Sequence, residues 1–308
     1  MTIVSRVTHA VAHLANGLSA LLLAGCAAQS GPAAFSVPVG SIYVAMGSSY
    51  AAGPGVTTSA DTPPTRCQRS ADNYAHQFAR QHGLHLVDVS CGGATTAHIL
   101  GPWKELPPQI EAIPPDARLV TVTIGGNDVG FVGSLMKASC DGQVDLLSSA
   151  ASAMCGKMAA YAREKPQQFA AMQATADEAT WAKLEAAMDS IGEQVKRRAP
   201  NARLVFVDYI RIVPAKGCVS APFNNPVSAD TARTIALRLA NVTATVARRA
   251  GAGLVRASDL SRGHEACTAD SWSSGFAPPN GVTNFSPYHP NLAAMTAIAG
   301  ALDREVGR

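Results

Sequence analysis

The sequence is poor in charged residues and lacks the basic clusters that nucleic-acid-binding proteins carry. Only 15% of its 308 residues are Asp, Glu, Lys or Arg, and the formal net charge is +3. No run of Lys and Arg interleaved with aromatic residues occurs, so we expect no nucleic-acid partner. With 47% hydrophobic residues, the chain is expected to be globular and to bury a sizeable core.

Motifs for nucleotides and metals are also missing. The Gly-rich stretch at residues 47–55 contains no Lys, which a P-loop requires, and no expected strand is followed by GxGxxG. No cysteine has the CxxC or CxxH spacing of a zinc site. We therefore expect neither a cofactor nor a metal ion.

The N-terminus lacks an apolar run long enough to predict a membrane span. Residues 1–25 carry one positive charge, at Arg6, followed by an apolar stretch, which is the layout of a secretory signal peptide. The stretch ends in "LAGC", which resembles a bacterial lipobox, so we expect Cys26 to be lipidated and to anchor the protein to a membrane. Residues 26–39 are then a flexible tether. Ordinary signal cleavage one or two residues later is the alternative.

Six cysteines remain after Cys26, and an even number in an exported chain predicts disulfides. Six cysteines allow many pairings, and loop length favours neighbours in sequence order. The expected pairs are Cys67–Cys91, Cys140–Cys155 and Cys218–Cys267.

Short runs rich in Val, Leu and Ile predict buried strands, and continuous apolar strands favour a parallel sheet covered on both faces. Helical periodicity fills the segments between them, so we expect an α/β protein with a three-layer α/β/α (flavodoxin-like) fold and a central parallel five-stranded sheet. A single domain of residues 40–308 would hold it, with an Ala/Met-rich helical insertion at 132–178. The strands are expected in residues 42–47, 84–91, 117–125, 202–210 and 252–258, and the helices in 70–83 (capped by Ser70 and Gly83), 178–200 and 228–251.

Polar residues follow three of the expected strands, at the ends where open α/β sheets bind their ligands. Ser48 and Ser49 follow the first strand, Gly93 lies in a Gly-Gly turn after the second, and Asn127 follows the third. His289 lies near the C-terminus. Each residue alone is common in turns. Ester hydrolysis, however, needs a hydroxyl, a base for its proton and donors for the developing oxyanion, and together these residues can supply all three.

This set resembles the SGNH (GDSL-type) hydrolases, and its order along the chain matches the family. "GSSY" around Ser49 is similar to the family's first block, Gly93 to the second, "IGGND" with Asn127 to the third and "HPN" with His289 to the last. The resemblance covers nearly all of the mature chain. "CQRS", "SCGGATT" and "GHEAC" are similar to secreted, actinobacterial-type esterases and lipases, which implies three disulfides paired in sequence order.

The resemblance implies a role for each residue. Ser49 is the nucleophile, and His289 is the general base and then the acid for the leaving alcohol. The oxyanion hole consists of the backbone N–H groups of Ser49 and Gly93 and the side-chain amide of Asn127. Glycine at position 93 lets the backbone approach the substrate closely.

Two positions depart from the family pattern. Ser48 stands where the family usually has Asp and is an alternative nucleophile, although the surrounding register favours Ser49. Ser286 stands where the family usually has an Asp, three residues before His289. We expect the carbonyl or hydroxyl of Ser286 to orient the imidazole, which gives a Ser–His dyad instead of a triad.

Other residues offer alternatives for the base and the acid. His264 is a rival base, for which a structural or pocket-rim role beside Cys267 is expected, and Asp259 or Asp270 could replace the acid from a distance. The remaining candidates are expected on solvated or helical faces: His76, His82, His85 and His98.

We therefore expect an exported, monomeric serine esterase or lipase that acts on small-molecule or lipid esters. The alternatives are an acyltransferase or deacetylase of the cell envelope on the same fold, and a ligand-binding lipoprotein without turnover. Pocket walls are expected from the 132–178 insertion and from residues 259–285, but the sequence determines neither their shape nor the acyl chain length.

Overall fold

Five parallel strands form one sheet in the computed structural model, which describes residues 37–141, 149–173, 176–279, 282 and 284–307. The strand order is β2-β1-β3-β4-β5, and every neighbouring pair is parallel. The predicted five-stranded parallel sheet is confirmed: the first strand has its expected bounds, and the other four are shorter than the apolar runs that indicated them. The strands are β1 (Ile42–Gly47), β2 (His85–Asp88), β3 (Leu119–Thr123), β4 (Arg203–Val207) and β5 (Gly253–Val255).

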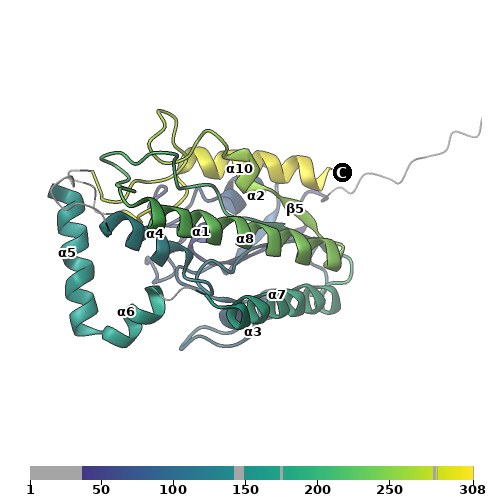
Figure 1. Ribbon diagram of the computed structural model, residues 1–308. Coiled ribbons are helices and arrows are strands. Elements are labelled where there is room, and N and C mark those ends of the chain that lie inside the picture. Colours follow the sequence, from purple (N-terminus) through teal and green to yellow (C-terminus); the bar gives the residue numbers. More distant parts are fainter. Residues whose placement is uncertain (1–36, 142–148, 174–175, 280–281, 283, 308) are drawn as a thin grey trace, which may run out of the picture. The chain divides into compact units, whose positions relative to one another are not determined.

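Helices cover both faces of the sheet, as a parallel sheet of fully buried central strands requires. Helices α2 (Tyr74–His82) and α10 (Leu292–Val306) pack against each other on one side. Helices α7 (Glu178–Arg198) and α8 (Pro226–Ala250) pack together on the other, with α3 (Thr96–Leu100) beside α7 (Figure 1). The short helices are α1 (Ser49–Ala52), the 3-10 helix η1 (Gln109–Ala112) and α9 (Ala257–Leu260).

Two helices begin at other residues than expected, because other side chains cap them. Ser70 was expected to cap α2, but its hydroxyl bonds to Thr57, and the side chain of Asn73 accepts from the backbone of His76 instead. Helix α2 therefore starts four residues after Ser70, at Tyr74. Helix α8 starts earlier than expected because Asn225 caps it.

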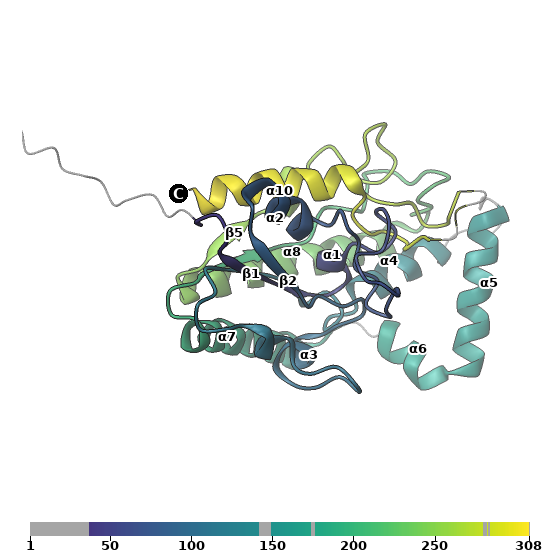
Figure 2. The ribbon, with the colours of Figure 1, turned by 180° about the vertical axis from the view of Figure 1, so that it is seen from behind.

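The expected helical insertion contains α4 (Phe131–Cys140), α5 (Ser149–Glu164) and α6 (Pro166–Gln173). Helix α4 packs against α8, whereas α5 and α6 project away from the sheet, as the rear view in Figure 2 also shows. We call residues 149–173 the arm. Its attachment to α4 includes the Cys140–Cys155 disulfide.

The six cysteines of the described chain form three disulfides: Cys67–Cys91, Cys140–Cys155 and Cys218–Cys267. These are the pairs that sequence order favoured. Because disulfides persist in oxidising compartments, they indicate an exported protein.

The expected signal peptide (1–25), the lipidation site Cys26 and most of the tether (26–39) lie outside the described residues. Within the described residues, no helix combines the length and apolar character needed to cross a bilayer.

Candidate active site

The chain segments that follow β1, β2 and β3 meet at the carboxyl edge of the sheet. The segment after β1 is pinned to β3, because the N–H of Ser48 donates to the carbonyl of Thr123 at 2.9 Å. The turn requires glycine at position 47: its φ is +145°, and a Cβ there would lie 2.4 Å from the Thr123 oxygen. The strand-to-helix turn therefore presents Ser49 as the first residue of α1.

Ser49 and His289 are in direct contact, although 240 residues separate them. The Oγ of Ser49 lies 2.7 Å from Nε2 of His289, and each residue is 8% exposed. The other ring nitrogen, Nδ1, lies 2.7 Å from the main-chain oxygen of Pro287. A carbonyl oxygen only accepts, so Nδ1 carries the proton and Nε2 accepts from the serine hydroxyl.

The expectation that Ser286 orients the imidazole is wrong. Its carbonyl instead accepts a hydrogen bond from the Ser274 hydroxyl, and the same Ser274 oxygen accepts from the His289 N–H at 3.0 Å. Tyr288 has a left-handed backbone (φ +58°), and in this turn the carbonyl of Pro287 reaches the ring. The imidazole therefore has a main-chain acceptor, supplied one residue later than expected.

Burial determines the charge of this histidine. Removal from water lowers the pKa of His289 to about 4, and the hydrogen bond to the Pro287 carbonyl opposes that shift only in part. Among the described residues, no carboxylate forms an ion pair or hydrogen bond with His289. The imidazole is consequently neutral at pH 7 and able to accept a proton.

The three residues expected to form the oxyanion hole each have a hydrogen-bond donor available. Within the described part of the chain, the N–H groups of Ser49 and Gly93 have no acceptor. The side-chain amide of Asn127 donates one hydrogen to the carbonyl of Ala94 at 2.8 Å, which leaves its second hydrogen available. Gly93 has a φ of +84°, which favours glycine.

The loop of Asn127 is fastened to the N-terminus of α3. The carboxylate of Asp128 accepts from the N–H of Thr96 at 3.1 Å and from its hydroxyl at 2.5 Å. Burial raises the pKa of Asp128, and the hydrogen bonds from Thr96 work against this shift. This arrangement fixes the neighbouring amide beside the Gly93 turn.

The alternatives for nucleophile and acid lie elsewhere. Ser48 is buried, and its hydroxyl bonds to the Tyr209 hydroxyl at 3.2 Å instead of to a histidine. Asp259 pairs with Arg262. Asp270 contacts His264, whose ring also stacks on a tryptophan.

The remaining histidines also lie away from the serine. His76 and His82 face the carboxylates of Asp88 and Asp303, respectively. His85 is exposed, and the ring of His98 stacks on Trp103 at 4.1 Å.

A groove of about 700 Å³ is lined by two of the expected oxyanion donors, Gly93 and Asn127, and its lining does not include Ser49 or His289. It runs between α4 and the arm, and most of its other walls are apolar. The wall residues include Val132 and Met136 from α4, and Lys157, Met158, Tyr161 and Phe169 from the arm. The insertion therefore forms a pocket wall, as expected from the sequence.

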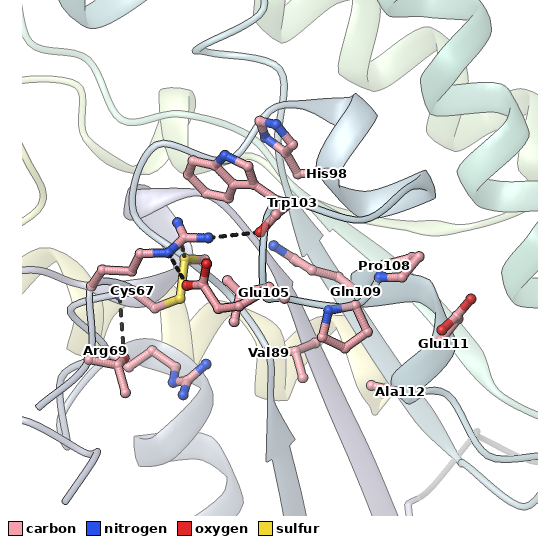
Figure 3. A pocket seen from close by; sticks show the side chains of 15 residues that line it. Cys67, Arg69, Val89, His98, Trp103, Glu105, Pro108, Gln109, Glu111 and Ala112 are labelled. Carbon is pink, nitrogen blue, oxygen red and sulfur yellow. Dashed lines mark hydrogen bonds and ion pairs between the residues drawn. A yellow bond between two sulfur atoms is a disulfide. The ribbon is translucent and has the colours of Figure 1, made fainter. Parts of the chain in front are cut away.

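A second cavity, of about 600 Å³, lies beside the Cys67–Cys91 disulfide (Figure 3). Trp103 forms part of its wall, with the Arg66 guanidinium 4.1 Å from the ring centroid. Arg66 also pairs with Glu105 at 2.7 Å. Unlike the groove, this cavity is lined by neither Gly93 nor Asn127, so we do not assign it to the candidate active site.

Sequence reasoning missed several residues that hold the site together. Tyr50 and Tyr288 are direct chain neighbours of Ser49 and His289, and this adjacency was a usable signal. No comparable signal in the sequence indicates Tyr209 or Gln109. The Tyr209 hydroxyl accepts from the N–H of Gly126, and the Gln109 amide bonds to both backbone groups of Gly47. Among the described residues, no group of three or more His, Cys, Asp or Glu side chains could hold a metal ion.

Comparisons with known proteins identify the family of the chain. The profile of the GDSL-like Lipase/Acylhydrolase family matches residues 45–297. Lipase 2 of Streptomyces coelicolor is 32% identical over 288 residues, which are 92% of this chain and 91% of that protein.

Two solved structures share the fold. The extracellular lipase of Streptomyces rimosus is 25% identical, with a TM-score of 0.62 over 86% of this chain and 99% of that one. Phospholipase A1 of Streptomyces albidoflavus is 24% identical, with a TM-score of 0.64 over 87% of this chain and 100% of that one, which shows the shared fold alone. Taken with the family match, these likenesses establish that the chain belongs to the GDSL-like lipase/acylhydrolase family and is a carboxylic ester hydrolase.

Proposed function

We propose that the protein hydrolyses carboxylic esters with Ser49 as nucleophile and His289 as general base, without a carboxylate behind the histidine. The observation that carries the proposal is the 2.7 Å hydrogen bond between Ser49 Oγ and His289 Nε2. A buried, neutral imidazole with its Nδ1–H held by a main-chain carbonyl supports the role of base.

In the proposed reaction, Ser49 Oγ attacks the ester carbonyl carbon while its proton moves to Nε2 of His289. The carbonyl oxygen becomes an oxyanion that the N–H groups of Ser49 and Gly93 and the amide of Asn127 stabilise. His289 then gives the proton to the leaving alcohol. Water, activated by the same imidazole, releases the acid from the serine.

The neutral acceptor behind His289 limits this reaction. A carboxylate would stabilise the imidazolium that forms during attack, and the carbonyl of Pro287 does so less, because it carries only a partial charge. We therefore expect a modest turnover number compared with a full triad.

The groove supports a lipase-type preference for esters with apolar acyl chains. Its lining includes Gly93 and Asn127, so an ester carbonyl that accepts hydrogen bonds from these donors would have the groove between α4 and the arm open to its acyl chain. The walls of Val132, Met136 and Phe169 match such a chain, since burying methylene groups stabilises the complex by about 0.8 kcal/mol each.

A protein that only binds its ligand needs no serine hydroxyl bonded to a neutral histidine. The proposal therefore favours turnover over the ligand-binding lipoprotein. We further propose a monomer that is exported through residues 1–25 and anchored by a lipid on Cys26. Residues 26–39 would be the tether and residues 40–308 the hydrolase domain. Mass spectrometry of the mature N-terminus tests this: an unmodified N-terminus beyond Cys26 would contradict the anchor.

Labelling with a serine-directed fluorophosphonate tests the chemical proposal. The label should appear on the peptide that contains Ser49, in wild type and in Ser48→Ala, and should be absent from Ser49→Ala and His289→Ala. Ser48→Ala is the matched control because it removes a neighbouring hydroxyl that points toward Tyr209. Labelling of Ser49→Ala at the wild-type rate would refute the proposal.

A further inference from the structure

A chain of buried hydrogen bonds connects the neighbours of Ser49 and His289. The hydroxyl of Tyr50 donates to the main-chain carbonyl of Tyr288 at 2.6 Å. At its other end, the Tyr288 hydroxyl bonds to the hydroxyl of Ser139, on α4, at 2.5 Å. Tyr288 is thus held from α1 at its backbone and from α4 at its side chain.

The backbone conformation of Tyr288 in this turn is unfavourable. Tyr288 has a φ of +58°, a left-handed backbone that bulky residues rarely adopt and that persists only where the surroundings impose it. Its ring is fully buried and stacks on Phe223 and Phe276, with centroids 5.2 and 5.9 Å away. The ring contacts and the two hydrogen bonds together fix this turn.

The turn matters because it supplies the acceptor for the imidazole. Pro287 immediately precedes Tyr288, and its carbonyl accepts from Nδ1 of His289, which immediately follows. The carboxylate of a triad is a charged side chain that extends to the imidazole. A backbone carbonyl has no such side chain, so its position relative to the imidazole depends on the conformation of the turn. The ring of Tyr50 also packs on the imidazole, with centroids 5.0 Å apart.

We propose that Tyr288, held by Tyr50 and Ser139, is the positioning residue that takes over the orienting task of the missing carboxylate. The proposal rests on the proposed function of His289 as base. It also ties the base to the groove, because Ser139 lies on the same helix as the groove residues Val132 and Met136. The helix that lines the groove for the acyl chain therefore also holds the turn that orients the histidine.

Three single substitutions remove the two hydrogen bonds while keeping the packing: Tyr50→Phe, Tyr288→Phe and Ser139→Ala. Each should lower kcat for p-nitrophenyl butyrate by about tenfold or more, with KM nearly unchanged, because a misplaced base slows chemistry without weakening binding. Tyr288→Phe and Ser139→Ala break the same bond, so the double variant should be no slower than either single variant.

Tyr43→Phe is the matched control. It removes a buried tyrosine hydroxyl that bonds to Thr121 at 2.8 Å within the sheet and has no contact with the histidine turn. It should lower the melting temperature about as much as Tyr288→Phe while leaving kcat at the wild-type value. If either tyrosine variant fails to fold, Ser139→Ala still removes the hydrogen bond to the Tyr288 hydroxyl and tests the proposal.

The Nδ1–H proton of His289 gives a second readout by NMR. Its hydrogen-bonded resonance should be displaced or broadened in Tyr50→Phe and Tyr288→Phe, and should stay in place in Tyr43→Phe. Wild-type kcat and an unchanged resonance in the folded variants would show that the tyrosines only stabilise the fold, and would overturn the proposal. That result is distinct from failure of the proposed function, in which Ser49→Ala itself would keep its activity.

Discussion

The Nδ1–H of His289 donates to the main-chain carbonyl of Pro287 at 2.7 Å. This hydrogen bond replaces the carboxylate contact of a triad. Its acceptor is a backbone atom, so the side chain of Pro287 does not reveal this role in the sequence. The orientation of the imidazole therefore depends on the backbone around His289 more than on the side chain of Ser286.

Substitutions at two serines separate backbone from side-chain effects. Ser286→Ala should leave kcat close to wild type, because only the main-chain oxygen of Ser286 has a hydrogen bond, from Ser274, among the described residues. Ser274→Ala should lower kcat, because that hydroxyl bridges the Ser286 carbonyl and the His289 N–H. Steady-state kinetics on both variants checks this, and a large loss in Ser286→Ala alone would contradict the backbone account.

The rate should depend on pH through His289. Because burial lowers the pKa of this imidazole to about 4, its neutral, proton-accepting form dominates above that pH. We expect kcat/KM to rise from acid pH with a midpoint near 4 and to stay level through pH 7. An acid limb centred on the ordinary histidine value of about 6.5 would show that the ring is solvated in the free enzyme.

Removing the amide of Asn127 should act on the transition state. Asn127→Ala is expected to lower kcat by roughly 100- to 1000-fold with little change in KM, because one oxyanion donor is lost. The variant also loses the bond to the Ala94 carbonyl, so thermal unfolding should be measured alongside. A change confined to KM would mean that the amide binds substrate and transition state equally.

Filling the groove should change chain-length preference. Met136 lies on the α4 wall, and Met136→Trp adds bulk where the acyl chain would lie. Turnover of p-nitrophenyl acetate should persist, whereas turnover of the dodecanoate ester should fall strongly. Equal losses on both esters would place the acyl chain elsewhere.

The parallel sheet was predictable because its strands are continuous apolar runs, which are typical of a parallel sheet covered on both faces. The positions of Ser49, Gly93, Asn127 and His289 could be anticipated because strand ends meet at one edge and the motifs carry recognisable residues. These signals are local in the sequence, so they can be recognised without knowledge of distant contacts.

The parts that sequence reasoning missed depend on distant contacts. The acceptor at Pro287 is a carbonyl, which every residue has, and its placement follows from the left-handed turn at Tyr288. The hold on that turn comes from Tyr50 and Ser139, which are 238 and 149 residues away. The helix cap at Asn73 likewise displaced Ser70 because Ser70 had a better partner in space.

The most direct test is the initial rate of p-nitrophenyl butyrate hydrolysis by wild type, Ser49→Ala and Ser48→Ala, purified side by side. We expect turnover by wild type, background rate for Ser49→Ala, and measurable turnover for Ser48→Ala. Wild-type turnover by Ser49→Ala would contradict the assignment of Ser49 as the nucleophile.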